Sequence, residues 1–190
     1  MKTLTEILEK NLIGKKVLGL FILANIVYIL MLVVTIPRTM DFSNGMDLLD
    51  MRPMGYDWAY VNKLFNNLGE EGRSTYLTLQ LPVDMLYPFL FGISYCLVIA
   101  YFLNKLNRLH FPYIFLCLLP LLAGIADYLE NFGIISMLKG YPDLSEFSVN
   151  MTSVFSVIKS ISTSVFFITI IIMLLILGFQ AISRKKIRAK

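Results

Sequence analysis

The chain has 190 residues, 57% of them hydrophobic and 16% charged, with a formal net charge of +4. A mean hydropathy of +0.70 leaves little sequence for a separate soluble domain and favours a membrane protein. The basic residues flank apolar segments instead of forming a basic domain with interleaved aromatics, which argues against a nucleic-acid partner.

The segment before the first apolar run, residues 1–16, is predicted to be a short helix on the cytoplasmic surface of the membrane. Its apolar residues recur at helical spacing, while its lysines would face lipid headgroups; the apolar residues are Leu4, Ile7, Leu8 and Leu12. The following apolar run is long and lacks a small-residue cleavage site, so we expect it to stay attached as a signal anchor.

Four segments are predicted to cross the membrane, because a bilayer core needs about 20 helical residues. They are residues 17–36, 83–104, 112–138 and 152–182. Backbone groups inside a bilayer are satisfied within a helix, so each segment is predicted to be helical. The predicted fold class is therefore an all-α integral membrane protein, a four-transmembrane-helix bundle forming a single membrane domain over residues 1–190.

The first connection, residues 37–82, is predicted to be a partly helical outer loop. A helix is expected to start near Asp57 and to stop at Gly69, because apolar residues recur at intervals of three and four; they are Trp58, Val61, Leu64, Phe65 and Leu68. We expect the apolar face of this helix to cover the tops of the spans, with the outer membrane surface as the alternative. Pro88 is expected to bend the second span.

Basic residues predict the orientation of the bundle. Four Lys residues precede the first span, one Lys and one Arg separate the second from the third, and five Lys and Arg lie in the tail over residues 183–190. Because cytoplasmic segments are rich in Lys and Arg, both termini are predicted to be cytoplasmic. The abundance of Lys and Ile makes a bacterial inner (plasma) membrane the expected location.

The residues that usually hold metals or redox cofactors give no pattern. Cys96 and Cys117 lack the spacing of a zinc site or a redox pair and are expected to be small buried residues. His110 is the single histidine, which excludes haem held between two histidines of this chain. We therefore predict no metal site and no cofactor.

Ionisable residues within the predicted spans require an explanation, since a charge in the bilayer is costly. Helical rise from the inner ends of the spans places Asp127 at ~24 Å, Glu130 at ~28 Å and Asp84 at ~30 Å, all near the outer boundary. Lys159 falls at ~36 Å by the same count, so its helix must tilt or its side chain must bend to reach a carboxylate. Asp127, Glu130 and Asn131 share one helix face.

If these groups form a site, two or three close carboxyls would repel each other, so one is expected to hold a proton. Asp127 is the candidate for that acid, Asp84 or Glu130 for the ionised partner, and Lys159 for the counter-ion. Such a pair is able to work as a general acid and base. The alternative is that acids near span ends only meet headgroups or water.

Other residues are candidates for orienting a ligand. Tyr87, Asn131 and Tyr76 lie near the same level, and Arg73 precedes the second span, where a guanidinium is able to grip a lipid phosphate or carboxylate. The alternative for Arg73 is a solvated loop residue.

The sequence therefore predicts a membrane protein that binds a small lipophilic or lipid-like molecule in a polar cup near the outer leaflet, with chemical processing left open. Membrane lipid is the expected surrounding partner. One alternative is an accessory or structural subunit that docks a membrane-protein partner or a second copy of the chain, because polar span faces mediate helix association. A second alternative is a small proton-coupled transporter that loads a proton on Asp127. The sequence identifies neither the ligand, nor a reaction, nor the oligomeric state.

Overall fold

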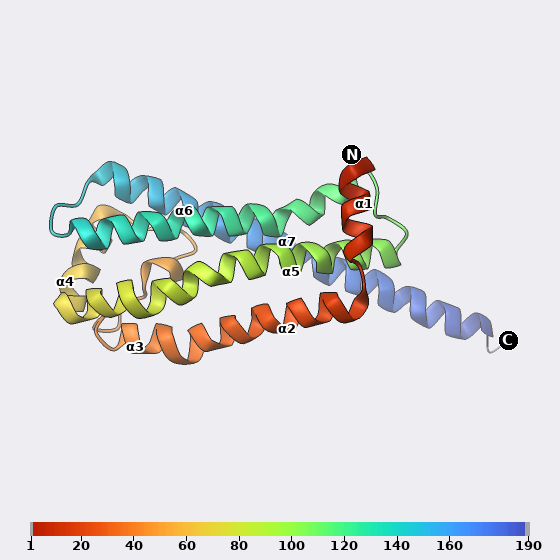
Figure 1. Cartoon of the computed structure of the whole chain (residues 1–190), viewed down its shortest axis with the longest axis horizontal. Helices are drawn as coiled ribbons and strands as arrows, with labels where there is room; N and C mark the ends of the chain where they lie inside the picture. The colour runs from red at the N-terminus through yellow and green to blue at the C-terminus, as the bar shows by residue number, and fades with distance from the viewer. Residues whose placement is uncertain (1, 189–190) are drawn as a thin grey trace.

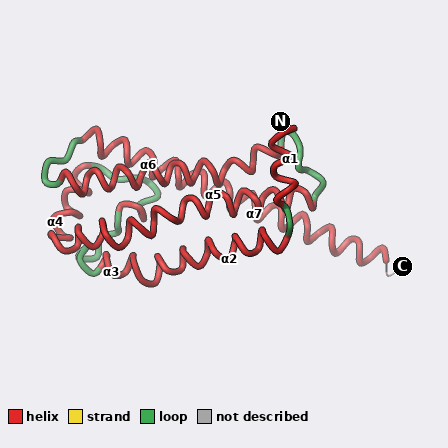
Figure 2. The backbone as a smooth tube through the Cα atoms, viewed as in Figure 1, coloured by secondary structure: helices red, strands yellow, loops and turns green. Residues whose placement is uncertain are grey.

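The computed structural model describes residues 2–188, and the side chains of residues 5–183. The described chain is helical apart from short connections (Figure 2). Four of its helical segments are long and apolar enough to cross a membrane, so the protein is a multi-pass membrane protein. Figure 1 shows the long helices running side by side, with both ends of the chain at the same end of the bundle.

The first crossing is one continuous helical path. It comprises α2 (Gly14–Leu30), the π-helical turn η1 (Met31–Thr35) and α3 (Ile36–Met40). The helix α1 (Lys2–Asn11) stands across the end of the bundle (Figure 1) and packs on α5, with Leu8 buried. The outward face of α2 is apolar and exposed, as expected for a helix that contacts lipid.

The second crossing is joined to the preceding loop without a break. After the short turn η2 (Leu49–Met51), the chain forms α4 (Trp58–Thr75), the π-helical turn η3 (Tyr76–Gln80) and α5 (Leu81–Lys105). The helix extends well before the predicted start of the span at residue 83, because the segment after Gly69 resumes a helical path.

The start and the break of α4 have local causes. The Asp57 side chain caps the helix by accepting a hydrogen bond from the Tyr60 backbone N–H at 2.8 Å. Gly69 has a φ of +60°, which glycine adopts at little cost, and it interrupts the helix. Between them, Val61, Leu64 and Phe65 are fully buried against the outer part of the bundle.

The third and fourth crossings form a tightly packed pair. The 3₁₀ turn η4 (Tyr113–Leu118) leads into α6 (Leu119–Gly140), and α7 spans Glu146–Arg188. With 43 residues, α7 is ~65 Å long, more than a bilayer core requires. It runs diagonally behind α6 and α5 and continues past the bundle (Figure 1). Residues 183–188 of the predicted basic tail, 183–190, fall on this extension; the side chains from residue 184 onward and all of residues 189–190 lie outside the described residues.

Small residues set the helix spacing. A Cβ at Gly124 of α6 would lie 2.8 Å from the carbonyl oxygen of Pro88, so only glycine allows α5 and α6 to approach this closely. Gly133 of α6 has the same role against α7, because a Cβ there would overlap the side chain of Thr152. Pro88 lies inside α5, which continues past it.

The order of packing leaves one side of the bundle open. The helix α2 packs on α5, α5 on α6, and α6 on α7. Among the described residues, α2 and α7 have at most sparse contact, so the row of helices does not close into a tightly packed ring. This opening determines the shape of the cavity described below.

We predict that Gly133→Ala lowers the stability of the detergent-solubilised protein, because the added methyl group overlaps Thr152 and separates α6 from α7. Overpacking of this kind costs about 1–3 kcal/mol. The measurement is the midpoint of thermal unfolding. Gly140→Ala is the matched control on the same helix, since a Cβ there meets nothing within 4 Å. Equal midpoints for the two variants would contradict the packing described here.

Candidate functional site

A cavity of about 1130 Å³ lies between α2, α5, α6 and α7. Its lining residues on the first crossing run from Gly14 of α2 to Ile36 of α3, a helical rise of ~33 Å, so the cavity is long and follows the axis of the bundle. Because α2 and α7 form its two edges with at most sparse contact between them, the cavity is open along the side of the bundle.

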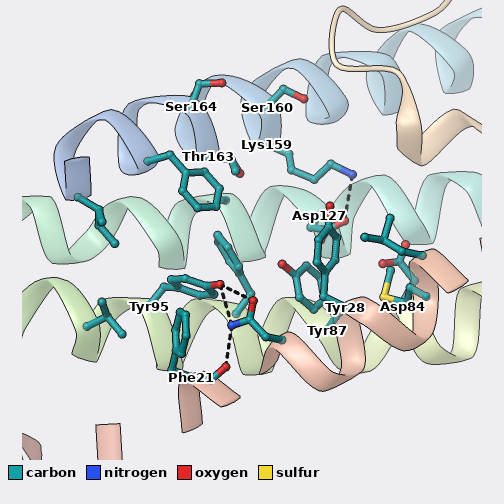
Figure 3. Close-up of a pocket in the computed structure, with 18 of the residues that line it drawn as sticks. Phe21, Tyr28, Asp84, Tyr87, Tyr95, Asp127, Lys159, Ser160, Thr163 and Ser164 are labelled. Atoms are coloured by element: carbon teal, nitrogen blue, oxygen red, sulfur yellow. Dashed lines mark hydrogen bonds and ion pairs between the residues drawn. The ribbon is translucent and has the colours of Figure 1, made fainter. Parts of the chain in front are cut away.

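Most of the cavity wall is aromatic and aliphatic. Tyr28 of α2 stacks on Tyr87 of α5 with ring centroids 5.3 Å apart, and Phe91 and Tyr95 continue the wall along α5 with centroids 4.7 Å apart. On α2 the wall is interrupted by Asn25, whose side-chain amide donates to the Tyr95 hydroxyl at 3.0 Å and to the Phe21 carbonyl at 2.7 Å. On α7 three hydroxyl residues also line it, Ser160, Thr163 and Ser164 (Figure 3). Asn25 is thus satisfied by its neighbours, and the wall is largely apolar.

The end of the cavity beside the loop that holds Asp50, called the outer end after the predicted outer loop, is ionic, and Lys159 of α7 is its centre. Figure 3 shows Lys159 reaching from α7 toward Asp127 of α6. The ammonium nitrogen lies 3.3 Å from Asp127 Oδ1, forms an ion pair with Glu130 Oε2, and lies 3.3 Å from the Asp50 carbonyl oxygen. An ammonium group has three donors, so these three oxygens use all of them.

Asp50 belongs to the loop over the cavity and is held by the start of the second crossing. The Tyr76 hydroxyl donates to Asp50 Oδ1 at 2.5 Å, and the Gln80 amide donates to Asp50 Oδ2 at 3.0 Å. Gln80 in turn accepts a hydrogen bond from the hydroxyl of Thr35. Tyr76 and Gln80 lie in the π-helical turn η3 and Thr35 in η1, and π turns of this kind are frequent at functional sites.

Glu130 lies behind Lys159, away from the cavity. Its side chain is fully buried, and Oε1 accepts a hydrogen bond from the Ser156 hydroxyl at 2.5 Å. Nearby, burial raises the pKa of Tyr56 in the outer loop, so its hydroxyl stays protonated at physiological pH. The Tyr56 backbone N–H donates to Ser153 Oγ at 2.8 Å, which attaches the loop to α7.

Asp84 is different from the other acids of the cluster. It lines the cavity from α5 and is 3% exposed, yet its Oδ2 atom has no hydrogen-bond partner among the described residues. Lys159, whose donors are all engaged, forms no ion pair with it within the described part of the chain. Asp84 therefore presents a free acceptor at the outer end of the cavity.

The structure brings together most of the residues that the sequence nominated. Asp84, Tyr87, Asp127 and Lys159 line the cavity. Glu130 contacts Lys159 from behind, Tyr76 reaches the cluster through Asp50, and Asn131 is fully buried in α6 without lining the cavity.

Arg73 lies elsewhere. Its guanidinium donates to the Phe65 carbonyl at 2.8 Å and lies 4.5 Å from the ring centre of Tyr141. The first contact supports the broken path of α4 near Gly69. Arg73 is thus neither a solvated loop residue nor a residue that lines the cavity.

Sequence reasoning missed Asp50, Gln80 and Tyr28 as parts of this region. Asp50 lies in an irregular loop where no periodicity indicates which way a side chain points. The sequence did offer a signal for Gln80. It is a polar residue two positions before Pro82, and a polar side chain beside a membrane span requires a hydrogen-bond partner. Among the described residues, no group of three His, Cys, Asp or Glu side chains is arranged to hold a metal ion.

Comparison of the chain with protein-family models, with curated proteins and with solved structures finds no match. The functional argument therefore rests on the cavity and its residues.

We predict that Lys159→Met strongly destabilises the protein, because it leaves Asp127 and Glu130 buried without a counter-ion. Breaking a buried ion pair in this way costs roughly 3–5 kcal/mol. The measurement is thermal unfolding in detergent, with Lys63→Met on the exposed side of α4 as the control. Adding Glu130→Gln to Lys159→Met is expected to restore part of the loss, since it removes one of the unpaired charges. A double variant no more stable than Lys159→Met would contradict this account of the cluster.

Proposed function

We propose that the protein binds an amphiphilic, lipid-like molecule in the cavity between α2 and α7. The proposal rests on one observation. The cavity of about 1130 Å³ has a largely apolar wall along its length and charged side chains at one end, among them Asp84, Asp127 and Lys159. This division matches a molecule with a long apolar part and one polar end. Pockets for small ligands combine apolar walls with a few placed polar groups in the same way.

The open side of the bundle supports entry from the lipid phase. A molecule already in the bilayer would move laterally between α2 and α7 without leaving an apolar environment. Its polar end would meet Asp84 and Asp127, while its apolar part would lie along Phe91, Tyr95 and Phe167. When such a molecule moves from lipid into the cavity, its apolar part leaves one apolar environment for another. The specificity of binding would therefore come from the contacts of its polar end.

We place the ionic end near the outer leaflet, with both termini in the cytoplasm of a bacterial cell. The distribution of Lys and Arg supports this orientation. Binding is better supported than chemical turnover. Asp127 and Glu130 are both paired with Lys159, whereas Asp84 has no ion pair and its buried Oδ2 atom has no partner among the described residues.

An accessory role is the second candidate, and the extension of α7 favours it. The helix passes beyond the bundle (Figure 1) with large apolar side chains exposed, among them Leu175, Ile176 and Phe179. Another membrane helix is able to pack on such a face. A companion polypeptide that co-purifies at a fixed ratio would support this role. Proton-coupled transport has less support, because the ionic groups lining the cavity lie at its outer end only.

A variant that fills the cavity tests the proposal. Thr163 lines the cavity one turn inward from Lys159, and Thr163→Phe is expected to block the path of an alkyl chain. The measurement is photolabelling in lipid nanodiscs with hexadecanol carrying a diazirine in its alkyl chain, followed by peptide mapping. We expect wild-type protein to be labelled on cavity residues of α2, α5 and α7, and the variant to lose most of this labelling.

Ile161→Phe is the matched control, because Ile161 lies on the same helix, is 59% exposed and is not part of the cavity lining. It is expected to leave cavity labelling unchanged. Labelling spread evenly over lipid-facing residues in wild type and both variants would contradict the proposal.

A further inference from the structure

We infer that the cavity selects an amphiphile with a positively charged, hydrogen-bond-donating head, of the class of long-chain aliphatic amines, over one with an anionic head. This inference rests on the proposed function and adds the chemical class of the ligand. It follows from which donors and acceptors remain free at the ionic end of the cavity.

The donors of the cluster are already used. Lys159 directs its ammonium group at Asp127, Glu130 and the Asp50 carbonyl. The Tyr76 hydroxyl and the Gln80 amide are both directed at the Asp50 carboxylate. A phosphate or carboxylate head would therefore find no free cationic donor at this end, only the neutral hydroxyls of residues such as Tyr28, Tyr87 and Ser160 that line the cavity.

The acceptors are not all used. Asp84 lines the cavity, is 3% exposed, and has an Oδ2 atom without a partner among the described residues. A buried acceptor without a partner is unfavourable, so a donor supplied by the ligand gains the full benefit of pairing with it. An ammonium head supplies up to three such donors, and a carboxylate acceptor strengthens the bond because both groups are charged.

The balance of charge points the same way. Four carboxyl groups, those of Asp50, Asp84, Asp127 and Glu130, surround the single ammonium of Lys159. The outer loop, residues 37–82, holds three arginines, and none of them lines the cavity. Arg52 pairs with Asp47 at 3.8 Å, and Arg73 lies on Tyr141. A cationic head would supply a second positive charge to this group of carboxyls. An anionic head would be repelled by those that are ionised, in a low-dielectric region where such repulsion is weakly screened.

The aromatic wall is compatible with this head. Tyr28 and Tyr87 stack next to Asp84 at the outer end of the cavity (Figure 3). Aromatic faces attract cations, and they also pack well against alkyl chains. A molecule with an ammonium group near Asp84 would thus pass its first methylene groups over this stacked pair.

The experiment compares three probes with the same diazirine-bearing hexadecyl chain and different heads: an amine, an alcohol and a phosphate. Each is added to wild-type protein in nanodiscs at neutral pH. Labelling of cavity residues is divided by labelling of the lipid-facing residues Ile171 and Leu175, which corrects for partitioning of each probe into the bilayer. We expect the normalised cavity labelling by the amine to exceed that by the phosphate by about tenfold or more. This is the difference expected when the amine gains a charged hydrogen bond and the phosphate loses one.

Asp84→Asn identifies the residue responsible, because it removes the charge with little change of shape. The preference for amine over alcohol is expected to disappear, while labelling by the alcohol remains and shows that the cavity is intact. Asp143→Asn, at an exposed acid in the connection between α6 and α7, is the control and is expected to keep the preference.

The outcomes separate this inference from the proposed function. Equal labelling by amine and phosphate, or a preference unchanged in Asp84→Asn, would overturn the inference while the alcohol still supports an amphiphile site. The comparison of amine with phosphate on wild-type protein decides the matter even if Asp84→Asn does not fold. Cavity labelling no stronger than lipid-facing labelling for all three probes would overturn both.

Discussion

The buried ammonium group of Lys159 is the interaction on which the arrangement of the outer end depends. It contacts two carboxyl groups of α6 and a backbone carbonyl of the outer loop, and so joins α7, α6 and the loop at one point. A charge at this depth is tolerated only with partners, which fixes the position of α7 along α6 and holds Asp50 over the end of the cavity. Once these contacts are made, Lys159 has no donor left for a ligand.

The second constraint is that, among the described long helices, α2 packs mainly on α5 and makes at most sparse contact with α7. In a membrane, apolar helices gain nothing from the hydrophobic effect by closing on each other, because lipid tails are equally apolar. A bundle is therefore able to stay open on one side at little cost, provided that its glycine contacts hold the remaining helices together. Gly124 and Gly133 supply these contacts, and the open side becomes a lateral entrance to an apolar cavity with an ionic end.

Much of this arrangement could be predicted from the sequence, and the exceptions have physical causes. The four crossings follow from the length of the apolar segments, and the meeting of Asp127 with Lys159 follows from helix faces. The depth of Lys159 did not follow, because helical rise was counted from Ser183, whereas α7 extends past the inner ends of its neighbours. Asp50 was missed because an irregular loop has no periodicity. For Arg73 the sequence offered a lipid head or solvent as its surroundings, whereas its guanidinium binds the Phe65 carbonyl.

The most direct test of the central claim is an experimental structure of the protein in lipid nanodiscs with no ligand added. The account predicts elongated non-protein density between α2 and α7, running from the level of Asp84 along Phe91 and Tyr95, with Lys159 still bound to Asp127 and Glu130. A structure in which α2 packs directly on α7, or in which a helix of another polypeptide fills the space, would contradict it.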